Sequence, residues 1–143
     1  MGELAERISS LAANCKAWPS LNHPDLDHGM MWIPDGDGMI ELDKNTIRRA
    51  VLSDYELLGS LLGYVFKPCH HAWIRWCLMH PMCAIEAPRG FGKTHVCTYL
   101  IAILRALRDF DRTCLITSET DTQVVSFMRV LKGHFEQSEG LKQ

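Results

Sequence analysis

The sequence lacks an excess of positive charge. Its 143 residues hold 15 Lys and Arg against 17 Asp and Glu, which gives a formal net charge of −2. Proteins that grip nucleic acid usually carry a strongly basic surface, so this composition gives no general support for such a role and leaves only a local contact open. With 47% apolar and 22% charged residues, the composition is that of a globular chain, and the length suits about one domain.

Long apolar runs are also missing. The longest, residues 96–104, contains Thr98 and ends at Arg105, far short of the roughly 20 residues that cross a bilayer. The first residues are polar and acidic, so no signal peptide is expected. We therefore expect an intracellular protein with no membrane partner, whose six cysteines are reduced and pack as small side chains.

The cysteines and histidines do not have the spacing of a metal site. Seven residues separate Cys69 from Cys77 and five separate Cys77 from Cys83, whereas paired zinc ligands are usually two to four residues apart. A helix can bring Cys77 near His80, but no second pair completes a site. Packing is therefore favoured over zinc binding.

Residues 1–42 are predicted to form an N-terminal helix followed by a loop segment rich in Pro, Gly and Asp. Apolar residues recur at helical spacing over residues 4–18, and Pro19 ends the pattern. The loop contains Asp-Gly-Asp-Gly at residues 35–38. If Gly38 is aligned with the glycine of a calcium-binding EF-hand loop, Ile33 and Lys44 fall where carboxylates are required. A turn is predicted there instead of a calcium site.

From residue 43 the sequence becomes helical. Asp43 or Asn45 can cap a helix that includes residues 47–52. Ser53 and Glu56 have the spacing of a capping box for a second helix. Pro68 begins a third predicted helix, residues 69–79, which is rich in His and Trp.

The most informative motif, A-P-R-G-F-G-K-T, lies at residues 87–94. The apolar run at residues 82–86 predicts a strand before it, and residues 93–108 predict a helix after it. Glycines in such a loop let backbone N–H groups converge on a phosphate, and the helix adds its positive dipole end. Lys93 is then expected to reach the β- and γ-phosphates of ATP, and the Thr94 hydroxyl to bind Mg²⁺. The predicted cofactor-binding residues of the loop are Ala87, Pro88, Arg89, Gly90, Phe91, Gly92, Lys93 and Thr94.

One residue of this loop departs from the usual pattern G-x-x-x-x-G-K-[ST]. Ala87 stands where that pattern has its first glycine. An ordinary turn with a chance Gly-Lys-Thr is the alternative, but the strand before and the apolar helix after favour a P-loop. A strand at residues 113–117 and a helix opened by a capping box at residues 120–123 follow. The predicted fold is therefore α/β, with a β-loop-α-β unit and a right-handed crossover, preceded by a helical N-terminal segment.

The order of these motifs resembles the large terminase subunit of tailed phages. The resembling stretches are residues 54–64, 68–73, 87–94 and 115–123, and A-P-R-G-x-G-K-[ST] is a frequent form of the Walker A loop in that family. The resemblance implies that residues 43–143 are the N-terminal part of an additional-strand P-loop ATPase domain, truncated before its Walker B motif. In such proteins the ATPase is joined to a nuclease and pumps DNA into procapsids.

The resemblance also implies roles for single residues. Lys93 and Arg89 are implied as catalytic residues, with Arg89 as an arginine finger supplied in cis. His70 or His71 stands where the family often has an adenine-contacting glutamine, and packing on the helix surface is the alternative for both. Double-stranded DNA, a portal protein and a small terminase subunit are the implied partners, in a homo-oligomeric ring in the cytoplasm of the infected host cell.

No Walker B motif follows the loop. The run at residues 113–117 continues into Ser118 and Glu119 without the aspartate that would hold Mg²⁺. The chain by itself is therefore expected to show no ATP turnover, with Glu86 and Glu119 as the only candidate carboxylates. Two other functions stay open, which are a helicase-like P-loop ATPase and a module that binds nucleotide or a partner without hydrolysis.

Overall fold

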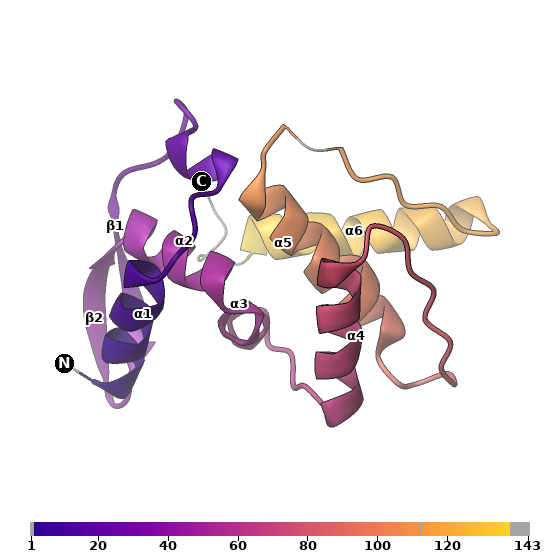
Figure 1. The fold of residues 1–143 in the computed structure, drawn as a ribbon, viewed down its shortest axis with the longest axis horizontal. Coiled ribbons are helices and arrows are strands. Elements are labelled where there is room, and N and C mark those ends of the chain that lie inside the picture. The colour runs from indigo at the N-terminus through magenta and orange to yellow at the C-terminus, as the bar shows by residue number, and fades with distance from the viewer. Residues whose placement is uncertain (1, 112, 138–143) are drawn as a thin grey trace.

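A computed structural model describes residues 2–111 and 113–137, which form helices and one two-stranded sheet. The last six residues of the predicted ATPase segment, 138–143, lie outside the described part. The elements are α1 (Glu3–Ala13), the 3₁₀ helix η1 (Pro19–Asn22), β1 (Met30–Asp35), β2 (Gly38–Asp43), α2 (Lys44–Ser53), α3 (Tyr55–Leu61), α4 (Pro68–Met79), the π-helix η2 (Thr94–Leu100), α5 (Ile101–Arg108) and α6 (Asp121–Gln137). Figure 1 shows α1, α2 and the sheet on one side and α4, α5 and α6 on the other, with α3 between them.

The N-terminal segment contains a β-hairpin that the sequence prediction missed. β1 and β2 pair antiparallel from Met30↔Asp43 to Asp35↔Gly38, so only two residues form the turn, and Gly36 has a φ of 65°. The predicted turn at residues 35–38 is confirmed, but the prediction of a loop throughout residues 20–38 is wrong. Pro34 is tolerated because a strand of a two-stranded sheet has one unpaired edge.

Side-chain caps define the helices that follow. The Asp43 carboxylate accepts a hydrogen bond from the Thr46 N–H at 2.9 Å, which confirms one of the two predicted caps of α2. Asp54, not Ser53, caps α3, because its carboxylate accepts from the Glu56 N–H at 2.8 Å. Ser53 instead lies in the last turn of α2 and donates to the Arg49 carbonyl. The predicted helix beginning at Pro68 is confirmed as α4.

Two predicted strands are absent. Residues 82–86 and 113–117 form no ladder, and within the described residues the β1–β2 hairpin is the only sheet. An extended segment becomes a strand only when another lies alongside to share its N–H and C=O groups. Neither segment has such a neighbour in the part of the chain that the structure describes. Residues 113–117 instead face η2 and α5 across a cavity of about 460 Å³.

The apolar core is centred on the helix that follows the loop. The predicted helix at residues 93–108 is present as η2 and α5, which continue directly into each other. Leu100, Ile103 and Leu104 are almost fully buried there, in the same cluster as Ile8 of α1 and Leu58 of α3. The core therefore extends across the predicted boundary between residues 42 and 43, which falls before the last residue of β2.

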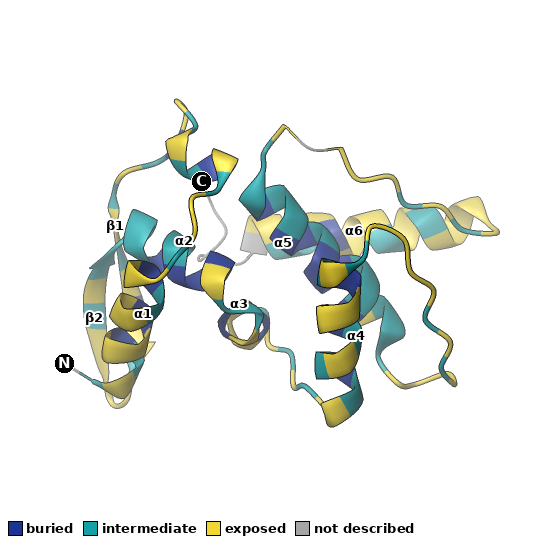
Figure 2. Ribbon diagram, in the orientation of Figure 1, coloured by how far each residue is buried: buried dark blue, intermediate teal, exposed yellow. Residues whose placement is uncertain are grey.

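The helix α6 is buried on one narrow side only. Leu131 is its single buried side chain among those described, whereas Val125, Met128 and Phe135 are exposed. Figure 2 shows most of α6 in the colours of exposed and intermediate residues. Its capping residue is Thr120, whose Oγ1 accepts from the Gln123 N–H at 3.4 Å, which confirms one half of the predicted capping box. The Gln123 side-chain oxygen accepts from the Ser118 hydroxyl instead of from the Thr120 N–H. No helix in the described residues is both long enough and apolar enough to cross a membrane.

Candidate functional site

The predicted phosphate-binding loop, residues 87–94, curls around a hollow of about 410 Å³ that is lined by residues 88–95. Gly90 and Gly92 have φ values of 80° and 79°, a region that side chains with a Cβ rarely adopt. The chain then enters the helix directly, since the Val96 N–H donates to the Gly92 carbonyl at 3.0 Å. The two glycines therefore make the turn that the motif requires.

Lys93 ties the end of the loop to its beginning. Its Nζ donates to the Ala87 carbonyl and, at 2.9 Å, to the Pro88 carbonyl. An ammonium group has three N–H donors, so one remains for another acceptor. The two carbonyls thus hold the ammonium group at the first two residues of the loop, although Lys93 is six residues away from Ala87 along the chain.

The charge of the hollow suits an anion. Its lining contains the cations Arg89 and Lys93 and no carboxylate, because residues 88–95 include neither Asp nor Glu. Arg89 is exposed. Thr94, which follows Lys93 in the sequence, is half-buried at the first position of η2. These side chains and the backbone N–H groups are the donors available to a phosphate.

His70 joins α4 to the back of the loop. Its ring Nδ1 accepts a hydrogen bond from the Lys67 N–H at 3.1 Å, and its Nε2 lies 2.7 Å from the Phe91 carbonyl oxygen. A carbonyl can only accept, so Nε2 carries the proton and Nδ1 is free to accept. The side chain is 6% exposed. His70 therefore lies against the loop, with both ring nitrogens occupied by partners within the chain.

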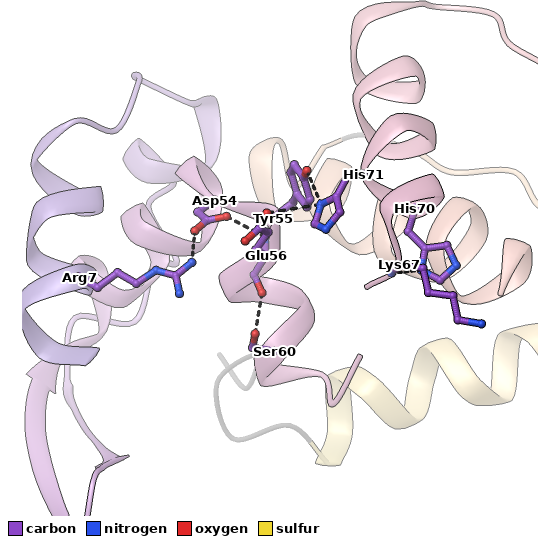
Figure 3. A network of polar contacts seen from close by, with 8 residues as sticks. All are labelled: Arg7, Asp54, Tyr55, Glu56, Ser60, Lys67, His70 and His71. Atoms are coloured by element: carbon purple, nitrogen blue, oxygen red, sulfur yellow. Dashed lines mark hydrogen bonds and ion pairs between the residues drawn. The ribbon is translucent and has the colours of Figure 1, made fainter. Parts of the chain in front are cut away.

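The structure separates His71 from the loop. Its Nδ1 lies 2.9 Å from the Tyr55 hydroxyl and 3.4 Å from a carboxylate oxygen of Glu56, both of α3. Figure 3 shows His71 turned toward these two residues, whereas His70 lies with Lys67 on the other side of α4. Of the two histidines proposed near adenine, only His70 is at the loop.

Three of the six cysteines, Cys77, Cys83 and Cys97, form a small thiol cluster at the loop helix. Cys77 Sγ lies 3.6 Å from Cys83 Sγ. Burial raises the pKa of the Cys77 thiol to about 12, and the neighbouring thiols of Cys83 and Cys97 add to this. Burial also raises the pKa of Cys97. Within the described residues, no three His, Cys, Asp or Glu side chains form a group that could hold a metal ion.

Sequence reasoning missed two sets of contacts around the loop. The Lys67 ammonium lies 5.7 Å from the centre of the Phe91 ring. The capping residue of α4 thus contacts the Phe91 side chain, and His70 of its first turn contacts the Phe91 backbone. Around the first turn of η2, His95 packs against Tyr64 and Tyr99 at ring distances of 5.7 and 5.5 Å. No sequence signal points to these contacts, because they depend on how distant helices pack.

The chain matches no protein-family model, no curated protein and no solved structure.

Proposed function

We propose that the chain binds Mg·ATP through residues 87–94 and is the ATP-binding part of a DNA-packaging motor of the terminase large-subunit class. The observation that carries the proposal is the position of the Lys93 ammonium, which donates to the Ala87 and Pro88 carbonyls at the start of the loop. Gly90 and Gly92, both with positive φ, form the turn of this loop. Backbone N–H groups and a lysine with one free donor are the groups that cradle a polyphosphate.

Each loop residue has a role in this proposal. The Lys93 ammonium would pair with the β- and γ-phosphates, and the Thr94 hydroxyl would hold Mg²⁺ together with phosphate oxygens. Arg89, exposed at the hollow, would stabilise charge on the phosphoryl group that is transferred. Bound Mg²⁺ would supply electrostatic stabilisation of the phosphate charge.

The wider role rests on the order of the motifs. In a full-length terminase this segment would couple ATP hydrolysis to translocation of double-stranded DNA, in a ring on a portal and together with a small subunit. That work takes place in the cytoplasm of an infected host cell. The absence of any long apolar helix among the described residues is compatible with that location.

Binding without hydrolysis is the second candidate function, and the lining of the hollow favours it. Residues 88–95 offer no carboxylate to activate a water molecule, and Glu86 and Glu119 are both exposed outside this lining. Residues 1–143 should therefore bind Mg·ATP without turnover. Steady release of phosphate that Lys93→Ala abolishes would contradict this and would support an ATPase complete within the chain.

Titration of the purified protein with Mg·ATP in a calorimeter tests the proposed site. Lys93→Ala removes charge-assisted hydrogen bonds, so affinity should fall by at least about tenfold. Lys132→Ala is the matched control, because this exposed lysine of α6 pairs with Glu136 at 3.4 Å and lies outside the lining of the hollow. Equal affinity in the wild type and in Lys93→Ala would refute the site.

A further inference from the structure

The hydrogen bond from His70 to the Phe91 carbonyl fixes the orientation of one peptide group in the loop. The peptide between Phe91 and Gly92 is trans, so its N–H points in the direction opposite to its C=O. The C=O is directed at His70, 2.7 Å from Nε2, on the α4 side of the loop. The Gly92 N–H is therefore directed away from α4.

We infer that His70 is a positioning residue for phosphate binding, which holds the Gly92 N–H toward the anion. The inference deepens the proposed function and rests on it. Rotation of this peptide changes ψ of Phe91 and φ of Gly92, and glycine accepts φ values of either sign at little cost. The sequence of the loop thus permits two orientations of the peptide, and the bond from His70 selects one of them.

The surroundings of His70 keep this donor in place. His70 is 6% exposed, its Nδ1 accepts a hydrogen bond from the Lys67 N–H, and the Trp73 ring packs on it at a centroid distance of 5.3 Å. The contact with the loop is close, because a Cβ built on Gly92 would lie 3.2 Å from His70 Nε2. A ring that packs against Trp73 and is hydrogen-bonded at both nitrogens has little freedom to release the carbonyl.

Two other roles would explain the same buried histidine. In the first, His70 serves only α4, where its Nδ1 satisfies a backbone N–H at the start of the helix. In the second, the ring leaves the Phe91 carbonyl and contacts the adenine base. The three roles use different ring atoms and different parts of the ligand, so two substitutions and three ligands separate them.

His70→Asn and His70→Gln divide the two hydrogen bonds between them. An asparagine oxygen can take the place of Nδ1 and accept from the Lys67 N–H, but the side chain is too short to reach Phe91. A glutamine amide can take the place of Nε2 and donate to the Phe91 carbonyl. We expect His70→Gln to keep Mg·ATP affinity within about twofold, and His70→Asn to lose about three- to tenfold, the worth of one hydrogen bond. Thermal unfolding of both variants shows that each is folded at the titration temperature.

The choice of ligand decides between phosphate and adenine. If His70 orients the phosphate cradle, His70→Asn should weaken Mg·ATP, Mg·GTP and magnesium tripolyphosphate by the same factor. A loss confined to Mg·ATP would overturn the inference in favour of an adenine contact. Full affinity in His70→Asn together with a loss in His70→Gln would overturn it in favour of a role in α4 alone.

A measurement on the free protein separates failure of this inference from failure of the proposed function. Nitrogen NMR of the imidazole should show a protonated Nε2 and an unprotonated Nδ1 for His70 at pH 7.5 in the absence of any ligand. The opposite tautomer would remove the bond to Phe91 and refute the inference alone. Absence of binding of all three ligands to the wild type would refute the proposed function, and the inference with it.

Discussion

The phenolic oxygen of Tyr64 lies 2.8 Å from Nε2 of His134, although 70 residues separate them along the chain. This contact attaches α6 to the segment that precedes α4. The His134 ring also faces Tyr99 at a centroid distance of 6.1 Å, close to His95 at the start of the loop helix. The otherwise exposed α6 is therefore held beside the candidate site by a cluster of titratable rings.

Acidification should weaken this cluster. Burial, and then the charge of His95, lower the pKa of His134 below its usual value of 6.5. The unfolded chain thus takes up the proton at a higher pH than the folded chain, so the stability from neutral His134 is present above pH 6.5 and is lost as pH falls through the folded pKa. His134→Gln can bond to Tyr64 but does not titrate. Between pH 7.5 and 5.5 the melting temperature of the wild type should fall further than that of this variant. Equal decreases would contradict the lowered pKa of His134.

Cys77 should resist alkylation in the folded protein. Its pKa of about 12 leaves a thiolate fraction of about one in ten thousand at pH 8, and the side chain is buried. Cys114 is exposed and serves as the internal reference. In a timed reaction with iodoacetamide, mass spectrometry should find Cys114 labelled at least about a hundredfold faster. Comparable rates would contradict the burial of Cys77.

The same thiol predicts how stability depends on alkaline pH. An unfolded thiol ionises near pH 9, whereas folded Cys77 stays protonated up to about pH 12. The stability from this group is complete below pH 9 and is lost as pH rises toward 12, with a slope of at most about 1.4 kcal/mol per pH unit. Urea denaturation at several pH values should show a shallower decline for Cys77→Ala than for the wild type, and identical declines would contradict the raised pKa.

Gly92→Ala should damage the loop more than a comparable change elsewhere. The alanine would be strained at a φ of 79°, and its Cβ would lie 3.2 Å from His70 Nε2. Strain of this kind costs about 1–2 kcal/mol. Gly63→Ala is the matched control, because its φ of 76° gives similar strain in open space outside the loop. Both variants should be destabilised, but only Gly92→Ala should also lose Mg·ATP affinity in the titration, and an unchanged affinity would contradict the account of the loop.

The elements that the sequence predicted correctly are those with local causes. Asp43 caps α2 through the amide of the nearby Thr46, and Pro68 begins α4 because its fixed φ suits a first helical turn. The glycine conformations of the loop are local as well, since Gly90 and Gly92 adopt positive φ where the motif requires it.

The features that the sequence did not predict depend on partners distant in the chain. Residues 82–86 have the composition of a strand, but a strand also needs a neighbour, and none lies beside them in the described residues. The hairpin was missed because Pro34 and the nearby aspartates are typical of loops, whereas pairing with Met39 places Pro34 in a strand. The contact of His70 with Phe91 spans 21 residues and depends on how α4 packs against the loop.

The most direct test of the central claim is a backbone amide NMR titration of the nitrogen-labelled protein with Mg·ATP. The account predicts that the largest shifts fall on the amides of Gly90, Gly92, Lys93 and Thr94, that tripolyphosphate reproduces them, and that Lys93→Ala abolishes them. Saturable binding with these four amides unmoved, or no shift at any concentration up to about 5 mM, well above ordinary affinities for nucleotides, would contradict it.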